Sequence, residues 1–136
     1  MEIQEILEKF RVVAVVGCSR DPSKPAHYVP KYLLGKGYTI IPVNPSADAI
    51  LGQKCYKSLG DIPQKVDVVD VFRPSSEALD ITRQAVAIGA KVVWLQEGIT
   101  STDAGAYAMR NNVIFVQDKC MMKQRMKIDG ETFGGA

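Results

Sequence analysis

Short runs of apolar residues, rich in valine and isoleucine, recur along the chain and alternate with longer polar or amphipathic segments. An almost continuous apolar run of this length is typical of a β-strand that is buried on both faces. The pattern predicts five strands, at residues 12–16, 38–43, 66–72, 91–95 and 113–116.

Helical spacing and helix-end residues occupy the segments between these runs. Pro25 opens a helix over residues 26–35, which stops at Gly35 or Gly37. Pro30 lies inside this helix and predicts a kink, or a start nearer Tyr28. The other predicted helices are an amphipathic one at 1–9, one from a Ser75 or Ser76 cap to Ile88, one from a Ser101 or Thr102 cap to Arg110, and a last one within 118–128.

The segment between the second and third strands has a weaker pattern. Residues 46–53 suggest a loop or a short helical turn, and 55–56 a brief extended piece. Residues 129–136 are expected to fray.

Alternation of strands and helices predicts an α/β protein with a parallel sheet and right-handed crossovers. We expect residues 1–136 to form one Rossmann-like, three-layer domain around a five-stranded parallel sheet. Numbered along the chain, the strands are expected in the order 3-2-1-4-5. Ligands of such sheets bind beyond the carboxyl ends of the strands. The expected site walls are 17–25, 43–46, 72–76, 96–100 and 117–120.

The first strand ends at Gly17, and a short polar loop leads from there to Pro25. The start of a helix leaves unpaired N–H groups and a partial positive charge, which favour phosphate. Arg20 and Lys24 add two positive charges at the same place. This loop therefore predicts a site for the phosphates of a nucleotide-containing ligand.

Composition and charge narrow the possible functions. The chain has 136 residues, 46% of them hydrophobic, and a net charge of +2 without a basic run, which argues against nucleic acid as a partner. No apolar stretch approaches the roughly 18 residues of a membrane span. The three cysteines lack metal-ligand spacing, so no metal site is expected. We expect them to be free thiols in the reducing environment of the cytoplasm.

The motifs of two common nucleotide-binding classes are absent. The first loop lacks GxGxxG, and the second strand ends in Val43-Asn44-Pro45 rather than in the carboxylate that holds the ribose of NAD. Asp48 lies nearby but past a proline turn, which disfavours NAD without excluding it. No GxxxxGK[ST] loop is present, so P-loop hydrolysis is excluded.

Four segments at strand ends carry a resemblance to a known family. They are VVGCSRDPSKP (15–25), PVNP (42–45), VFRPS (71–75) and QEGI (96–99). Together they resemble the CoA-binding domain family, which is similar to the nucleotide-binding domain of the succinyl-CoA synthetase alpha subunit. The resemblance runs from about Ile6 to about Lys123. It implies a cytoplasmic, stand-alone domain that binds coenzyme A.

The resemblance also implies a role for each motif. Gly17, Cys18, Ser19 and Lys24 would surround the pyrophosphate, in the loop that also holds Arg20 and Pro25. The adenosine part would be bordered by Val43, Asn44, Pro45, Phe72, Arg73 and Pro74, and the pantetheine path by Gly98 and Ile99. Two positions depart from the family pattern. Position 18 is more often alanine, and an acidic residue is usual where Gln124 stands.

Three side chains carry more specific expectations. Arg73, at a strand end, is the best candidate for contacting the 3′-phosphate of CoA. His27, the only histidine, is expected to be structural rather than catalytic. Cys18 is expected to be a small residue in a tight loop. The alternative hypothesis is a reactive thiolate, with a pKa lowered by the helix and the cations, that forms a mixed disulfide with a small thiol.

No nucleophile with a neighbouring base is evident at the strand ends, which offer only Cys18, Asp21 and Glu97. We therefore expect no catalytic residue, and binding of CoA or acyl-CoA without chemistry. The alternatives are a small NAD(P)-binding oxidoreductase and an accessory subunit of a CoA ligase. The protein could form a homo-oligomer or bind a partner enzyme under any of these functions.

Overall fold

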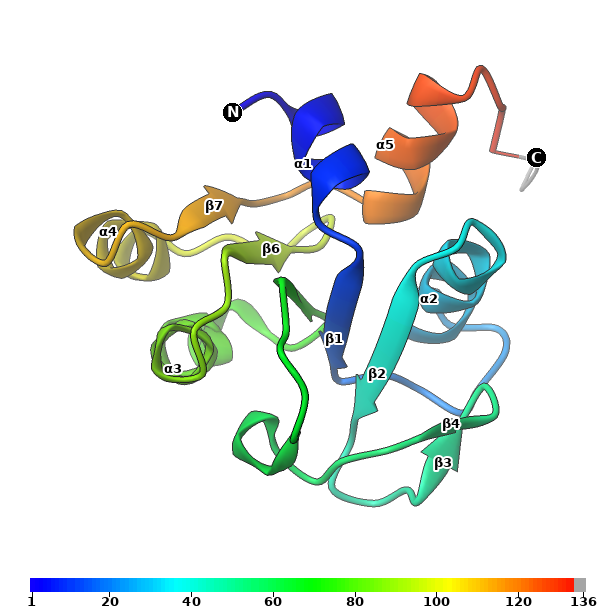
Figure 1. The fold of residues 1–136 in the computed structure, drawn as a ribbon, viewed down its shortest axis with the longest axis horizontal. Coiled ribbons are helices and arrows are strands. Elements are labelled where there is room, and N and C mark those ends of the chain that lie inside the picture. The colour runs from blue at the N-terminus through cyan, green and yellow to red at the C-terminus, as the bar shows by residue number, and fades with distance from the viewer. Residues whose placement is uncertain (134–136) are drawn as a thin grey trace.

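The computed structural model describes residues 1–133. Five strands form one parallel sheet in the order β2-β1-β5-β6-β7, and helices cover both of its faces (Figure 1). The sheet strands are β1 (Val12–Val16), β2 (Thr39–Val43), β5 (Val68–Val71), β6 (Val92–Leu95) and β7 (Ile114–Val116). The helices are α1 (Ile3–Lys9), α2 (Pro25–Gly35), α3 (Ala78–Ala87), α4 (Thr102–Arg110) and α5 (Met121–Ile128), with 3₁₀ turns η1 (Leu59–Asp61) and η2 (Ser75–Glu77).

Alternate strand residues separate two apolar layers. Val13 and Val15 of β1 pack in the layer that holds α1, α2 and α5, whereas Ala14 packs in the layer with η1, α3 and α4. Figure 1 shows α2 and α5 on one side of the sheet and α3 and α4 on the other. The α/β class, the three layers and the five parallel strands are as the sequence predicts.

The predicted strand order is wrong. The third apolar run, which forms β5, pairs with β1 and not with the outer edge of β2. β1 therefore has β2 on one side and β5 on the other. The connection from β1 leads to one side of the sheet, and the connection from β2 crosses back to the other side. In open parallel sheets such a switch point opens a crevice at the carboxyl ends of the two strands.

The segment that joins β2 to β5 explains the difference. It forms a small hairpin of β3 (Ala49–Ile50) and β4 (Gln53–Lys54), and not the loop or short helical turn predicted for 46–53, and then returns to the edge of β2. There Tyr56 makes a one-residue parallel bridge to Val43, with the Asn44 N–H donating to the Tyr56 carbonyl at 2.9 Å. The extended piece predicted at 55–56 thus fills the place that the prediction gave to residues 66–72.

The helices follow the predicted segments, with three corrections. Neither Ser75 nor Ser76 caps α3, because both lie in η2 and Glu77 is the N-cap residue of α3. α2 begins at Pro25, so the start near Tyr28 is wrong. The fraying predicted for 129–136 is also wrong where the chain is described, because Lys36 of α2 pairs with Asp129 at 3.1 Å and Glu131 at 2.9 Å. The rest of that prediction, residues 134–136, lies outside the described residues. Within residues 1–133 no helix has the length and apolar character that crossing a membrane requires.

Candidate ligand-binding site

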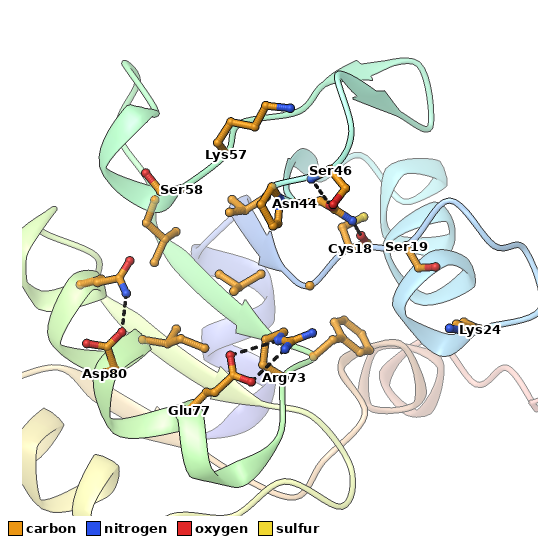
Figure 2. A pocket seen from close by; sticks show the side chains of 18 residues that line it. Cys18, Ser19, Lys24, Asn44, Ser46, Lys57, Ser58, Arg73, Glu77 and Asp80 are labelled. Carbon is orange, nitrogen blue, oxygen red and sulfur yellow. Dashed lines mark hydrogen bonds and ion pairs between the residues drawn. The ribbon is translucent and has the colours of Figure 1, made fainter.

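Two adjoining cavities lie at the carboxyl ends of the strands. The first, of about 690 Å³, opens at the switch point between β1 and β5, and Figure 2 shows its lining residues. The second, of about 350 Å³, lies over the ends of β5 and β6 beside α2 and α5. Lys24 and Phe72 line both, so the two cavities meet at the loop that follows β1.

Gly17 allows β1 to turn into this loop. Its φ of +86° is in the left-handed region that favours glycine. A Cβ atom at this position would lie 2.8 Å from the carbonyl oxygen of Phe72 and 2.9 Å from Cδ of Arg73. Any larger residue would therefore push apart the ends of β1 and β5, where the first cavity opens.

Residues of α2 hold the loop in place. Pro30 has no N–H to donate to the carbonyl of Ala26, one helical turn earlier. That carbonyl accepts a hydrogen bond from the Ser19 N–H at 3.0 Å. The Nδ1 atom of His27 donates to the Ser19 carbonyl at 2.7 Å. Pro30 thus leaves the Ala26 carbonyl free to accept the hydrogen bond from the loop, and His27 contacts the loop through the Ser19 carbonyl.

The start of α2 offers groups that bind anions. Lys24 is its N-cap residue and Pro25 its first residue, and no acidic residue lies in its first turn. Among the described residues, the main-chain N–H groups of Cys18 and Ala26 donate no hydrogen bond. Unpaired amides, the helix dipole and the Lys24 charge all favour a phosphate here.

Asn44 connects the loops that follow β1 and β2. Its Nδ2 donates to the Cys18 carbonyl at 2.9 Å, and its Oδ1 accepts from the Ser46 N–H at 2.7 Å (Figure 2). No carboxylate from the end of β2 lines the cavity; Asp48, which follows, is fully exposed and lies outside it. The position that would hold the ribose of NAD is thus taken by an amide with both of its groups bonded.

The opposite wall of the first cavity comes from η2 and α3. The guanidinium of Arg73 donates two hydrogen bonds to Glu77, at 3.2 and 2.9 Å, and these lower the pKa of Glu77 below its usual value. Gln84 donates to Asp80 at 2.8 Å. Arg73 thus lines the cavity with its charge already paired, and its contacts with an adenosine or a 3′-phosphate stay predictions.

The hypothesis of a reactive Cys18 thiolate is wrong. The side chain is fully buried in the layer of α1, α2 and α5, and this burial, with Cys55 and Asp70 nearby, raises the pKa of Cys18 to about 12. Desolvation of the thiolate outweighs the field of the helix terminus because the thiol points into the core. Cys18 fits the main expectation, a small residue in a tight loop.

A buried carboxyl group lies beneath the second cavity. Asp70 of β5 is completely buried, and burial raises its pKa to about 7. Its Oδ1 accepts from Nε2 of Gln96 at 2.6 Å, and its Oδ2 has no hydrogen-bond partner in the described chain. Gln96 also lines the second cavity, so its hydrogen bond links the Asp70 carboxyl group to the wall of that cavity.

Most residues expected at the site lie together. The first cavity takes in Gly17, Cys18, Ser19, Lys24, Val43, Asn44, Pro45, Phe72 and Arg73, and the second Lys24, Pro25, Phe72, Gly98 and Ile99. Arg20 and Pro74 are exposed and line neither cavity, so their predicted contacts have no support here.

Sequence reasoning missed the residues that reach the cavities from helices and from the β2–β5 connection. In the first cavity these are Lys57, Ser58, Leu59, Glu77, Asp80, Ile81 and Gln84, and in the second Tyr28, Val29, Met122 and Lys123. The i, i+3, i+4 spacing of the α3 residues was a visible signal, but it shows a shared face and not what that face meets. Across residues 1–133 no three His, Cys, Asp or Glu side chains gather in a metal-binding group.

Comparison with known proteins gives consistent matches. The sequence model of the family described as "CoA binding domain" matches residues 11–126. The chain is 36% identical to the uncharacterized protein YneT of Bacillus subtilis over 120 residues, which are 88% of this chain and 89% of that protein. It resembles a solved hypothetical protein of Pyrococcus horikoshii with a TM-score of 0.91 and 41% identity, covering 94% and 90% of the two chains.

A further match is to part of a larger enzyme. Acetate–CoA ligase [ADP-forming] II of Archaeoglobus fulgidus is 38% identical over 81 residues, which are 58% of this chain and 12% of the ligase. The chain is therefore similar to a small portion of that enzyme.

Proposed function

This chain belongs to the CoA-binding domain family, and we propose that it binds coenzyme A or an acyl-CoA, without catalysis, across the carboxyl ends of its parallel strands. The observation that carries the proposal is the pair of cavities that meet at the loop after β1. CoA also has two arms, an adenosine and a pantetheine, that meet at a diphosphate. We assign the diphosphate to the loop, the adenosine to the first cavity and the pantetheine to the second.

The diphosphate position has the strongest physical support. Lys24 lines both cavities, and the amides of Cys18 and Ala26 are unpaired within the described chain. Hydrogen bonds from charged groups contribute about 1.5–3 kcal/mol each, roughly twice a neutral one. Ser19 and His27 fix the loop before a ligand arrives, so little ordering is needed on binding.

The second cavity suits the pantetheine arm. Its wall includes Val29, Ile99 and Met122, which offer apolar surface, and the Gln96 amide supplies a polar group on the floor. Pantetheine alternates short apolar segments with amides, so it calls for this combination. At the cavity rim Lys123 donates to Glu97 at 3.0 Å, which links α5 to the loop after β6.

Binding without chemistry is favoured by the state of the candidate reactive groups. A thiol with a pKa of about 12 is a poor nucleophile near neutral pH, and the Nδ1 of His27 is bonded to the main chain. The similarity to an acetate–CoA ligase favours a second role, in which the bound CoA is presented to a partner enzyme. Binding of NAD is less well supported because the end of β2 carries Asn44 and no carboxylate lines that wall.

A ligand panel tests the proposal. We expect CoA to raise the thermal midpoint of the protein, because a ligand at 100 times its Kd stabilises by about 2.7 kcal/mol, while NAD, NADP and ATP give smaller shifts. Replacing Lys24 by alanine should weaken CoA binding in isothermal titration calorimetry. Lys31→Ala removes the same charge from the exposed side of α2 and serves as the control.

The outcomes separate the alternatives. A shift with NAD and none with CoA would refute the proposal, and so would equal effects of the Lys24 and Lys31 variants. Isolation of the chain in complex with a CoA-dependent enzyme, with faster turnover of CoA by that complex, would support the role as a ligase partner.

A further inference from the structure

The first cavity extends beyond the phosphate loop and has two walls of different charge there. One wall comes from η2 and α3, and both carboxylates that line the cavity, Glu77 and Asp80, belong to it. The opposite wall comes from the loops after β2 and Tyr56, and among the residues of 1–133 that line it Lys57 alone is charged (Figure 2). A second phosphate on the ligand would be repelled by Asp80 on the α3 side, where Glu77 is paired with Arg73, and attracted by Lys57 on the other side.

The three cations that line the cavity differ in how firmly they are held. Lys24 lies at the diphosphate loop, away from this end of the cavity (Figure 2). Arg73 makes a two-pronged ion pair with Glu77, at 2.9 and 3.2 Å. Both side chains are about half exposed, at 47% and 44%, so the pair is held by its bidentate geometry and not by burial. Two of the five N–H donors of Arg73 are used by Glu77, so a phosphate bound by the remaining donors would lie beside the Glu77 carboxylate and be repelled by it.

Lys57 is held more loosely. Its Nζ reaches the carbonyl of Ala47 at 3.3 Å and Oδ1 of Asp48 at 3.4 Å, both long contacts. The Asp48 side chain is fully exposed and that of Lys57 is about half exposed, at 54%, so solvent screens the pair. The stem of Lys57 already lies on the cavity wall, and its ammonium group can turn inward at little cost.

We propose that Lys57, and not Arg73, recognises the 3′-phosphate of the bound ligand, and so makes the site prefer CoA to its dephosphorylated form. This inference rests on the proposed binding of CoA. Lys57 is a specificity-determining residue, since the diphosphate loop holds the part that both ligands share. The Arg73–Glu77 pair then acts as a neutral part of the opposite wall.

The test compares CoA with dephospho-CoA by isothermal titration calorimetry on the intact protein. We expect the wild type to bind CoA about tenfold more tightly, a preference that falls as salt screens the contact. Lys57→Gln should lose most of this preference by weakening CoA alone, and Lys57→Arg should keep it. Lys54→Gln removes an exposed charge three residues away, outside the cavity, and controls for net charge.

Thermal melting of each variant shows that the fold is retained. Loss of the preference in Arg73→Gln with retention in Lys57→Gln would overturn the inference and return the role to Arg73. Equal binding of both ligands by the wild type would overturn it too, while leaving the proposed function standing. Absence of binding by either ligand would refute the proposed function and this inference with it.

Discussion

Asp70 places a titratable carboxyl group in the centre of the sheet, between Val15 of β1 and Trp94 of β6 in the strand register. Complete burial raises its pKa to about 7, and only one of its oxygens accepts a hydrogen bond. The folded protein thus keeps a proton that the unfolded chain releases above its ordinary pKa of 3.8. Unfolding releases this proton, so the contribution of Asp70 to the free energy of unfolding falls as the pH rises from about 4 to about 7 and is level above that range.

We predict that Asp70→Asn removes this pH dependence. Asparagine can still accept the hydrogen bond from Gln96 but carries no charge that must be buried. Between about pH 5 and about pH 8 the wild type should lose about 2–3 kcal/mol of unfolding free energy relative to the variant. Urea denaturation at both pH values measures this, and Asp103→Asn, exposed on α4, is the control. Parallel pH profiles for the wild type and Asp70→Asn would contradict the prediction.

At the scale of elements, the strands were predictable from local pattern alone. The run of valines at 12–16 forms β1 with the predicted ends, and the other four runs form strands within the predicted ranges. Strand order was not predictable in this way, because all main-chain edges are alike and the buried strands have similar apolar side chains on both faces. The weak extended pattern at 55–56 was the one local indication of the observed order, since Tyr56 forms a bridge to Val43 at the outer edge of β2.

The wrong strand order also explains which site residues were missed. Residues that directly follow strands, such as Gly17, Asn44 and Phe72, were placed correctly because the carboxyl ends of parallel strands share one edge. Asp80 and Gln84 reach the site only because β5 lies next to β1, which brings α3 to the cavity. Helix faces can be read from sequence spacing, but their neighbours depend on the order of the whole sheet.

The segment after α5 lies against α2 and contacts residues that line the second cavity. Phe133 stacks on Tyr28 with ring centroids 6.3 Å apart, and the Nζ of Lys123 lies 5.1 Å from the Phe133 ring. Tyr28 and Lys123 both line that cavity, so Phe133 supports its wall from outside. Glu131, which accepts a hydrogen bond from Tyr32 and pairs with Lys36, fastens the same segment.

We predict that Phe133→Ala weakens binding of CoA about two- to fivefold, because each such aromatic or cation–π contact contributes about 0.5–1.5 kcal/mol to positioning. Binding of adenosine 3′,5′-bisphosphate, which lacks the pantetheine arm, should not change. Calorimetry with both ligands measures the difference, and Met109→Ala, exposed on α4, is the matched control. An equal loss for both ligands would mean that the segment supports the whole site and not the second cavity.

At the scale of the whole molecule, folding hides all three thiols. Cys18, Cys55 and Cys120 are free and buried, and Cys18 has no exposed surface at all. Cys18 packs with residues of β1, α1, α2 and α5, so a reagent can reach its sulfur only when this core opens. The rate at which Cys18 is alkylated therefore reports the stability of the folded domain.

A ligand that binds only the folded state lowers the fraction of molecules with an open core. It must slow the alkylation of Cys18 by the same factor. At 100 times its Kd, CoA should reduce the labelling rate of Cys18 by about a hundredfold. Mass spectrometry of peptides from iodoacetamide-treated protein measures each cysteine separately. Cys120 borders the second cavity, so CoA should shield it directly as well. Labelling of native Cys18 at the rate of a free thiol would contradict its burial, and a slow rate that CoA does not change would contradict the binding of CoA at the phosphate loop.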